Sequence, residues 1–186
     1  MTQTQKTKFL TVGNLARIAI LAAMGVILSL FEFPLFVSAP FYKLDASGIA
    51  VMLAGFSMGF PGAFLTLLIK DLVGILVHPS SGWVGQLADF IMLFAFILPP
   101  TLIYQKKKTQ MTALIGMVIG TILMAVVSIF ANLYVLFPAY GFTAGFDFLT
   151  SFTVPFNLIK GGCLTLITFF IYKPLSPLLH GKGLRR

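Results

Sequence analysis

The sequence predicts an all-α membrane protein, a bundle of six transmembrane helices that forms a single domain over residues 1–186. Composition is the first observation behind this prediction. Of the 186 residues, 58% are hydrophobic and only 10% are charged, and the mean hydropathy is +0.99. The second observation is a series of six long apolar segments, and the third is the concentration of most basic residues in three regions of the chain. Together they exclude an ordinary soluble domain, in which about a quarter of the residues are charged.

The expected helices correspond to apolar runs that approach the roughly 20 residues needed to cross a bilayer. They cover residues 12–30, 45–59, 61–77, 84–104, 111–136 and 150–172. A turn between Gly59 and Pro61 is all that separates the second helix from the third. Because so little chain remains outside these segments, we expect one compact bundle without a separate aqueous domain.

The basic residues give the expected orientation. Most of them lie at the amino terminus, between the fourth and fifth helices, or at the carboxyl terminus, which are the same side of a six-span protein. They are Lys6, Lys8, Arg17, Lys106, Lys107, Lys108, Lys173, Lys182, Arg185 and Arg186. Because lysine and arginine are enriched in cytoplasmic loops, we expect both termini in the cytoplasm. The net charge of +8 is therefore a sign of membrane topology, not of nucleic-acid binding.

A cleaved signal peptide is the alternative interpretation of the amino-terminal segment, since lysines precede an apolar run and small residues occupy positions 37–39. A first transmembrane helix is favoured instead. The apolar run is longer than the usual signal core, Glu32 interrupts it, and Pro40 would follow the cleavage point.

Three loops are expected on the outer side, at residues 31–44, 78–83 and 137–149. The first and third are long and rich in aromatic residues, Tyr42 among them. Loops of this length often act as lids or binding loops. An interfacial belt of aromatic side chains is the alternative, although it explains single rings better than two whole loops.

Pairs of small residues spaced four apart lie in three of the helices. They are Gly55 with Gly59, Gly116 with Gly120, and Ala19 with Ala23. Such pairs share a helix face and let another backbone approach closely. Packing within the bundle is the favoured interpretation, and a docking surface for another membrane subunit is the alternative.

Residues for catalysis or metal binding are scarce. The histidines are His78 and His180, and Cys163 stands alone, so it is expected to be a small buried hydrophobic residue. No zinc-protease motif, cysteine-rich metal site or phosphate-binding loop occurs, so any use of ATP must reside in another chain. Asp71 and Asp89 lie in apolar helices, where hydrogen bonding inside the bundle and a role in coupling or binding both remain open.

A candidate binding site lies near the outer ends of the last two helices. Lys160 and Asn157 lie three residues apart on one helix face, and Asn132 lies at a similar depth in the preceding helix. An ammonium in a membrane helix usually faces a cavity or the bundle interior. Two amides and an ammonium beneath aromatic loops suit a flat, neutral ligand with polar edges. Simple hydrogen bonding between helices is the alternative for the asparagines.

Five parts of the chain carry a family resemblance that extends over essentially all of it. They are residues 41–47 (FYKLDAS), 70–72 (KDL), 85–90 (GQLADF), 130–132 (FAN) with 138–140 (PAY), and 155–161 (PFNLIKG). These segments resemble the riboflavin-binding S-components of energy-coupling factor transporters. The resemblance implies a bacterial plasma-membrane protein that captures riboflavin, with no cofactor, for uptake driven by a transmembrane T-component and two cytoplasmic ATPases.

The resemblance also assigns roles to particular residues. It implies flavin contacts from Tyr42, Asn132, Asn157 and Lys160, and it makes the alanine motif of the first helix, Ala19 with Ala23, the contact with the T-component. The segment comprising Leu44, Asp45, Ala46 and Ser47 is expected to close over the ligand. Gln86 is a further expected contact, although the family pattern leads us to expect an acid there, so any charge-dependent role at this position is in doubt.

Several alternatives remain open from the sequence. The same architecture could carry the phosphate of riboflavin, or another vitamin such as thiamine or a pyridoxine-like ring. The single tryptophan, Trp83, argues weakly against thiamine, whose cationic ring favours a richer aromatic cage. A small membrane enzyme would need a paired base or metal that the sequence does not display, and a solitary secondary transporter often shows an internal repeat that is absent here.

Overall fold

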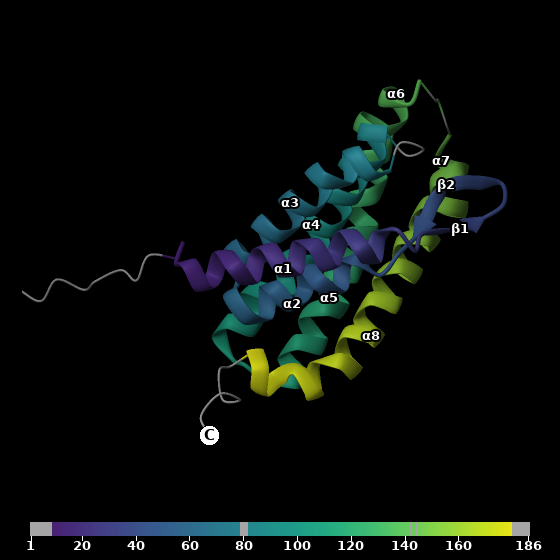
Figure 1. Ribbon diagram of the computed structural model, residues 1–186. Coiled ribbons are helices and arrows are strands. Elements are labelled where there is room, and N and C mark those ends of the chain that lie inside the picture. Colours follow the sequence, from purple (N-terminus) through teal and green to yellow (C-terminus); the bar gives the residue numbers. More distant parts are fainter. Residues whose placement is uncertain (1–8, 79–81, 142, 144, 180–186) are drawn as a thin grey trace, which may run out of the picture.

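The computed structural model describes residues 9–78, 82–141, 143 and 145–179, with side chains up to residue 172 (Figure 1). Several residues used in the topology prediction lie outside the described residues or have undescribed side chains. They are Lys6, Lys8, Lys173, Lys182, Arg185 and Arg186, and His180 of the carboxyl-terminal tail also lies outside the described residues.

Among the described residues, six helices traverse the bundle in alternating directions, one for each predicted segment (Figure 1). They are α1 (Val12–Ser29), α2 (Ser47–Met58), α3 (Phe60–Val77), α4 (Gly82–Lys106), α5 (Gln110–Ala131) and α8 (Val154–Leu179). Because the number of traverses is even, the described chain begins and ends at the same end of the bundle. We call the other end the hairpin end.

Within the part of the chain that the structure describes, five helical stretches are long and apolar enough to cross a membrane, as expected of a largely helical membrane protein. The exception among the six traversing helices is α2, which has 12 residues and is therefore about 18 Å long. Every α2 residue from Ser47 to Phe56 is buried, and the helix contacts α1, α3, α4 and α8. The predicted second helix therefore exists, but it is shorter than expected and enclosed by its neighbours.

The first predicted loop contains a β-hairpin, which corrects the all-α expectation. Strand β1 (Phe33–Phe36) pairs antiparallel with β2 (Ala39–Leu44), with Phe33 opposite Leu44. Short strands that carry prolines have no clear alternating pattern, so the sequence did not reveal the pairing. The hairpin places one end of β2 directly before α2.

The third predicted loop, residues 137–149, contains two short helices, and the predicted helices on either side of it have π-helical ends. A π-helical turn, η1 (Asn132–Leu136), and a short helix, α6 (Phe137–Ala139), extend α5. A short helix, α7 (Phe146–Phe148), and a second π-helical turn, η2 (Leu149–Thr153), lead into α8. π-Helical turns are rare and frequently occur at functional sites. Both lie at the hairpin end of the bundle.

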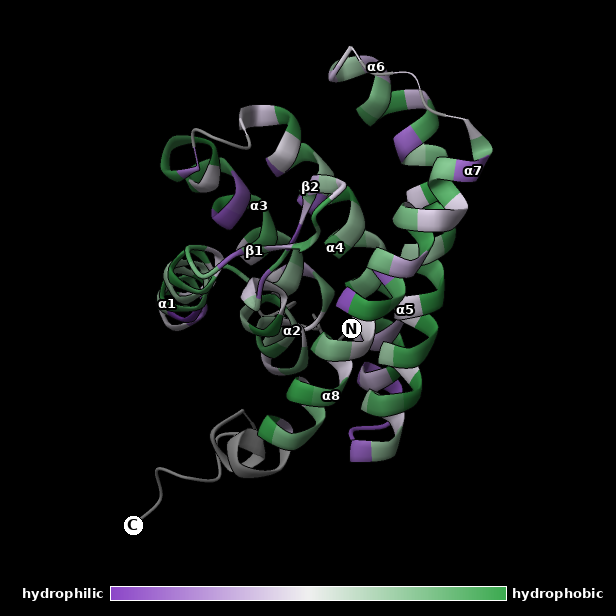
Figure 2. Ribbon diagram, turned by 90° about the vertical axis from the view of Figure 1, so that its right-hand side faces the viewer, coloured by the Kyte–Doolittle hydropathy of each residue, from purple (hydrophilic) through white to green (hydrophobic). Residues whose placement is uncertain are grey.

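The glycine pairs pack inside the bundle, as the favoured interpretation predicted. A Cβ atom added to Gly120 would collide with the carbonyl oxygen of Phe96, and one added to Gly116 would lie 2.5 Å from the Cα of Pro100. These glycines thus let α5 approach α4 closely. Figure 2 shows that hydrophobic residues dominate α5 and α8. By contrast, Ala19 and Ala23 are exposed on α1. Cys163, which was expected to be buried, is only half-buried in α8.

Candidate functional site

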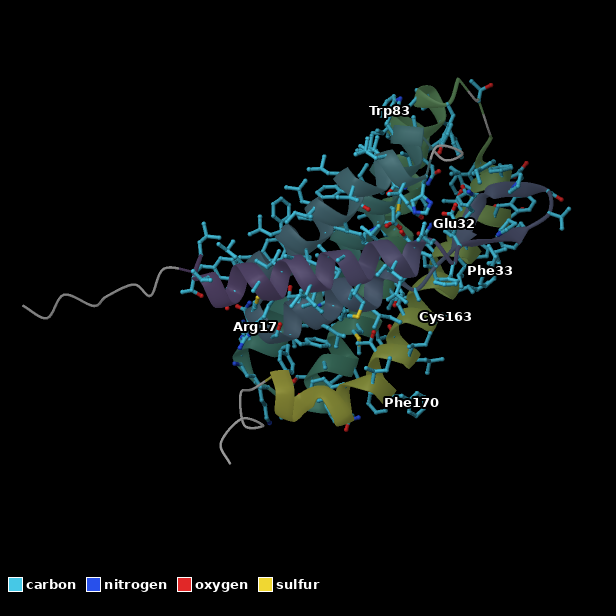
Figure 3. The ribbon with its side chains drawn as sticks, in the orientation of Figure 1. Arg17, Glu32, Phe33, Trp83, Cys163 and Phe170 are labelled. Carbon is cyan, nitrogen blue, oxygen red and sulfur yellow. The ribbon has the colours of Figure 1, made fainter. Side chains whose placement is uncertain are left out.

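A cavity of about 520 Å³ opens at the hairpin end of the bundle. Its walls come from the hairpin and from the ends of α1, α3, α4, α5 and α8 that meet there, including η1 and α6. The volume falls within the range of sites that enclose a small organic molecule. Figure 3 shows Glu32 beside the hairpin at this end, whereas Arg17 lies toward the opposite end.

A network of buried charges forms one part of the cavity. The Nζ of Lys160 lies 2.8 Å from Oδ2 of Asp45 and 2.6 Å from Oδ1 of Asp89. The second oxygen of Asp89 lies 2.6 Å from Nζ of Lys70, which also pairs with Asp71 at 2.5 Å. Lys70 and Lys160 are only 2% and 4% exposed. Asp89 therefore bridges two buried ammonium groups, one from α3 and one from α8.

This network changes the interpretation of Lys160. The sequence suggested an ammonium without a partner, but two carboxylates flank it. Burying an ion without a partner is costly, and these ion pairs reduce that cost. The ammonium has three hydrogens, and two point toward carboxylates in this arrangement, so the third is available to a ligand. Asp89 thereby acquires a defined structural role, while Asp71 lies outside the cavity lining.

Two buried amides form a second part of the cavity. Asn132 begins η1 and donates from Nδ2 to the carbonyl of Ser128 at 2.8 Å. Asn157, near the start of α8, donates in the same way to the carbonyl of Thr153 at 2.9 Å. The Oδ1 of Asn157 is buried and has no hydrogen-bond partner among the described residues. Each amide is thus held by a hydrogen bond to the preceding helical turn. The Oδ1 of Asn157 is left to accept a hydrogen bond from a ligand, and the second N–H of each amide is left to donate one.

Tyr42 connects the hairpin to these amides. Its hydroxyl donates to Oδ1 of Asn132 at 3.4 Å and also contacts the hydroxyl of Thr153 in η2. Burial raises the pKa of Tyr42 to about 12, and the hydrogen bond with Thr153 opposes the rise only in part. Tyr42 is therefore a neutral hydrogen-bonding group at physiological pH.

Aromatic rings cover the amides. The rings of Tyr42 and Phe156 lie 4.9 Å apart between centroids, and those of Phe41 and Tyr140 lie 6.3 Å apart. All four residues line the cavity together with Phe137. Rings contributed by the hairpin, α6 and α8 offer contacts to the face of a flat ligand.

A second polar cluster lies on the side formed by α1, α3 and the hairpin. Glu32 pairs with Lys43 at 2.5 Å and lies 3.6 Å from Nδ1 of His78, whose Nε2 contacts the hydroxyl of Ser29 at 2.9 Å. These four residues line the cavity, as does the buried Gln86. A side chain at Gly74 would collide with the amide of Gln86, so this glycine leaves the space that Gln86 occupies.

The structure brings most of the predicted site residues together. Tyr42, Asp45, Gln86, Asn132, Asn157 and Lys160 all line the cavity.

Three predicted residues are not part of the described cavity lining. Leu44 packs against the hairpin's small apolar cluster, and Ala46 packs against the main core. Ser47 is fully buried, and its backbone N–H donates to Oδ1 of Asp45 at 2.7 Å. Within this segment, Asp45 is the described residue that reaches the cavity.

Sequence reasoning missed the polar cluster and Lys70. Lys70 lies in α3, and His78 caps the end of that helix eight positions later, about two turns along. A lysine and a histidine at this spacing on an apolar helix were a usable signal. Glu32 and Lys43 gave none, because only the hairpin register brings them together.

A bundle of apolar helices around a buried, polar-lined cavity defines a membrane protein that binds a small molecule. Among the described residues, no group of three or more histidine, cysteine or acidic side chains could hold a metal ion. The model of the family "ECF transporter, substrate-specific component" matches residues 13–172. The chain therefore belongs to this family of transporter components, and the expectation that it is not an enzyme is confirmed.

The relatives agree with this assignment. The riboflavin transporter RibU of Streptococcus thermophilus is 33% identical over 178 residues, which cover 89% of this chain and 84% of the relative. RibU of Staphylococcus aureus is 29% identical, with coverage of 89% and 92%. The riboflavin transporter FmnP of Bacillus subtilis is 26% identical, with coverage of 89% and 93%.

A solved structure supports the fold. It is described as the S component of a bacterial ECF transporter, and it matches with a TM-score of 0.79 at 31% identity. The match covers 90% of this chain and 97% of that one. The family resemblance identified from the sequence motifs is thereby confirmed.

Proposed function

We propose that this protein is the riboflavin-binding S-component of an ECF-type vitamin transporter. It captures riboflavin in the cavity at the hairpin end, and partner subunits use ATP to complete the uptake. The observation that carries the proposal is the pair of buried amides, Asn132 and Asn157, which face one cavity beside the ammonium of Lys160. The names of the relatives, riboflavin transporters from three bacteria, support the choice of ligand.

The edge of the isoalloxazine ring offers one N–H donor between two carbonyl acceptors. The unpartnered Oδ1 of Asn157 accepts from this N–H, and an amide N–H or the ammonium of Lys160 donates to a carbonyl. Tyr42 holds Asn132 in place and contributes its ring to the flavin face. Asp45 positions the ammonium of Lys160 through their ion pair, and Gln86 forms hydrogen bonds with hydroxyl groups of the ligand. Leu44, Ala46 and Ser47 support the position of Asp45 rather than contacting the ligand.

The proposed topology has six membrane segments, with both termini in the cytoplasm and the hairpin end facing outward. Six alternating helices and a described chain that begins and ends at one end of the bundle support it. The basic run from Lys106 to Lys108 lies at that same end, between α4 and α5, as the positive-inside rule requires of a cytoplasmic loop. The plasma membrane of a bacterium is the matching location.

The proposed partners are a transmembrane T-component and two cytoplasmic ATPases. Ala19 and Ala23 form a small exposed surface one helical turn apart on α1, where another helix can approach closely. The absence of a phosphate-binding loop from the sequence is consistent with ATPases on other chains.

Flavin absorption and fluorescence test the proposed ligand directly. Protein purified in detergent is expected to carry a yellow chromophore or, after its removal, to quench riboflavin fluorescence with one-to-one saturation. Thiamine and pyridoxine serve as competitors. A folded protein that quenches nothing, or whose quenching thiamine reverses, would contradict riboflavin as the ligand.

A further inference from the structure

The cluster of Ser29, Glu32, Lys43 and His78 lines the cavity but takes no part in the contacts proposed above for the flavin ring. Glu32 is its centre, since its carboxylate pairs with the ammonium of Lys43 at 2.5 Å and lies 3.6 Å from the His78 ring. The side chain of Glu32 is 21% exposed and that of Lys43 25%, whereas His78 is 6% exposed. The pair is thus partly shielded from water, and its charges are screened less than those on an open surface.

The cluster and the amides occupy different walls. Asn132 and Asn157 belong to η1 and α8, whereas Ser29 is the last residue of α1, Glu32 lies directly before β1, and His78 follows the last residue of α3. His78 lies two helical turns, about 12 Å, beyond Lys70 along α3, and Lys70 belongs to the charge network that contains Lys160. A ligand whose ring edge is held beside Lys160 therefore has room to extend its side chain toward Glu32.

The charges around the cavity are balanced. Its lining contains three ammonium groups and three carboxylates, and each ammonium lies within 2.8 Å of a carboxylate. They are Lys43, Lys70, Lys160, Glu32, Asp45 and Asp89. A polyhydroxylated chain suits such a lining, because hydroxyl groups both donate to carboxylates and accept from ammonium or imidazole groups. A phosphate monoester, with a charge near −2, would instead face the carboxylate of Glu32.

We propose that Glu32 is a specificity determinant, which favours a ligand with an uncharged polyol chain over the same ligand ending in a phosphate monoester. This inference rests on the proposed function, because it assumes that riboflavin occupies the cavity. Glu32 acts in two ways: its charge repels the phosphate, and its ion pair with Lys43 occupies the nearest ammonium group.

Affinities for three flavins test the proposal. Riboflavin has the polyol chain, its 5′-phosphate adds the dianion, and lumiflavin lacks the chain. In the wild-type protein we expect the phosphate to bind at least about tenfold more weakly than riboflavin. Glu32→Gln should reduce this ratio about tenfold, mainly by tightening the binding of the phosphate, because one negative charge is lost. Glu32→Asp should preserve the preference.

Asp147→Asn is the matched control, since this acid is exposed on α7 at the same end of the bundle and outside the cavity lining. It should leave the ratio unchanged. Unchanged lumiflavin affinity in Glu32→Gln shows that the variant is folded. The proposal is overturned if Glu32→Gln leaves the ratio of the affinities for riboflavin and its 5′-phosphate unchanged, or if the wild type binds these two ligands equally. Neither result would contradict riboflavin as the ligand. Failure of the wild type to bind any of the three flavins overturns the proposed function as well.

Ionic strength gives a second measurement that needs no variant. If Glu32 repels the phosphate, added salt screens the repulsion and narrows the difference between the two ligands. If Lys43 and His78 instead attract the phosphate, added salt weakens its binding and widens the difference. The second outcome contradicts the proposal.

Discussion

Lys160 and Asp45 lie 115 positions apart in the sequence and form an ion pair with an Nζ–Oδ2 distance of 2.8 Å. The other oxygen of Asp45 accepts from the backbone N–H of Ser47 at 2.7 Å, so the carboxylate is fixed against the start of α2 as well as α8. Because β2 ends at Leu44, this pair connects the exit of the hairpin to the charge network of the cavity. The position of the hairpin and that of the Lys160 ammonium are therefore coupled.

Asp45→Asn should weaken riboflavin binding about tenfold to a hundredfold, because a hydrogen bond to a charged group typically contributes about 1.5–3 kcal/mol. The asparagine still accepts from Ser47, so the start of α2 is retained while the attraction to Lys160 is lost. Fluorescence quenching measures the affinity, and Asp147→Asn is the control for charge at the same end. Wild-type affinity in a folded Asp45→Asn protein would show that the pair does not contribute to binding.

Asn157→Ala should weaken riboflavin binding by about 1–3 kcal/mol, since the flavin N–H would be left without an acceptor. The bundle should remain folded, because the amide donates to Thr153 in the adjoining η2 turn, and no hydrogen bond among the described residues joins it to another helix of the bundle. Quenching titrations report the affinity, and thermal unfolding in detergent reports the fold. Asn14→Ala is a suitable control, because Asn14 lies near the start of α1 and bonds the carbonyl of Phe9, far from the cavity. Equal affinities of the wild type and Asn157→Ala would exclude this contact.

Tyr42→Phe should change the pH dependence of stability in the alkaline range. The folded-state pKa of Tyr42 is raised from 10.0 to about 12 because burial disfavours the phenolate. Its stabilisation is therefore fully present below pH 10 and is lost as the pH rises from 10 to 12. Unfolding temperatures measured across this range should fall more steeply for the wild type than for Tyr42→Phe. Parallel curves would indicate that the hydroxyl is not buried in the folded protein.

Much of the architecture could be predicted because hydropathy in a membrane protein is a local signal. Each apolar run became a helix, and boundaries at Val12 and Val77 matched the prediction. The hairpin was not predictable in this way, because its strands have four and six residues and their pairing depends on tertiary contacts. The additional turns η1 and η2 likewise depend on how the ends of α5 and α8 pack.

In the candidate site, too, the features set by local sequence could be predicted and those that depend on tertiary contacts could not. Asn157 and Lys160 share a helix face, so spacing alone placed them together. The carboxylates around Lys160 belong to Asp89, which is 71 positions away in the sequence, and to Asp45, which is 115 positions away. No local pattern encodes such pairs. In the sequence, Glu32 is recognisable only as a charge that interrupts an apolar run. Its role in the cavity could not be predicted, because its partners Lys43 and His78 become its neighbours only after the hairpin forms.

Replacing both Ala19 and Ala23 by tryptophan should abolish riboflavin uptake without weakening riboflavin binding. Both alanines are exposed on α1 and lie outside the lining of the cavity, so two indole rings are accommodated in the isolated protein. A partner helix that needs close approach would be pushed away by them.

The measurements are quenching by the purified variant, uptake of labelled riboflavin into cells, and copurification with the T-component. Val126→Trp is the matched control, since Val126 is 47% exposed on α5, a different helix. Normal uptake and assembly in the double variant would place the docking surface elsewhere, whereas loss of both in the control as well would point to a general effect of bulky residues on membrane insertion.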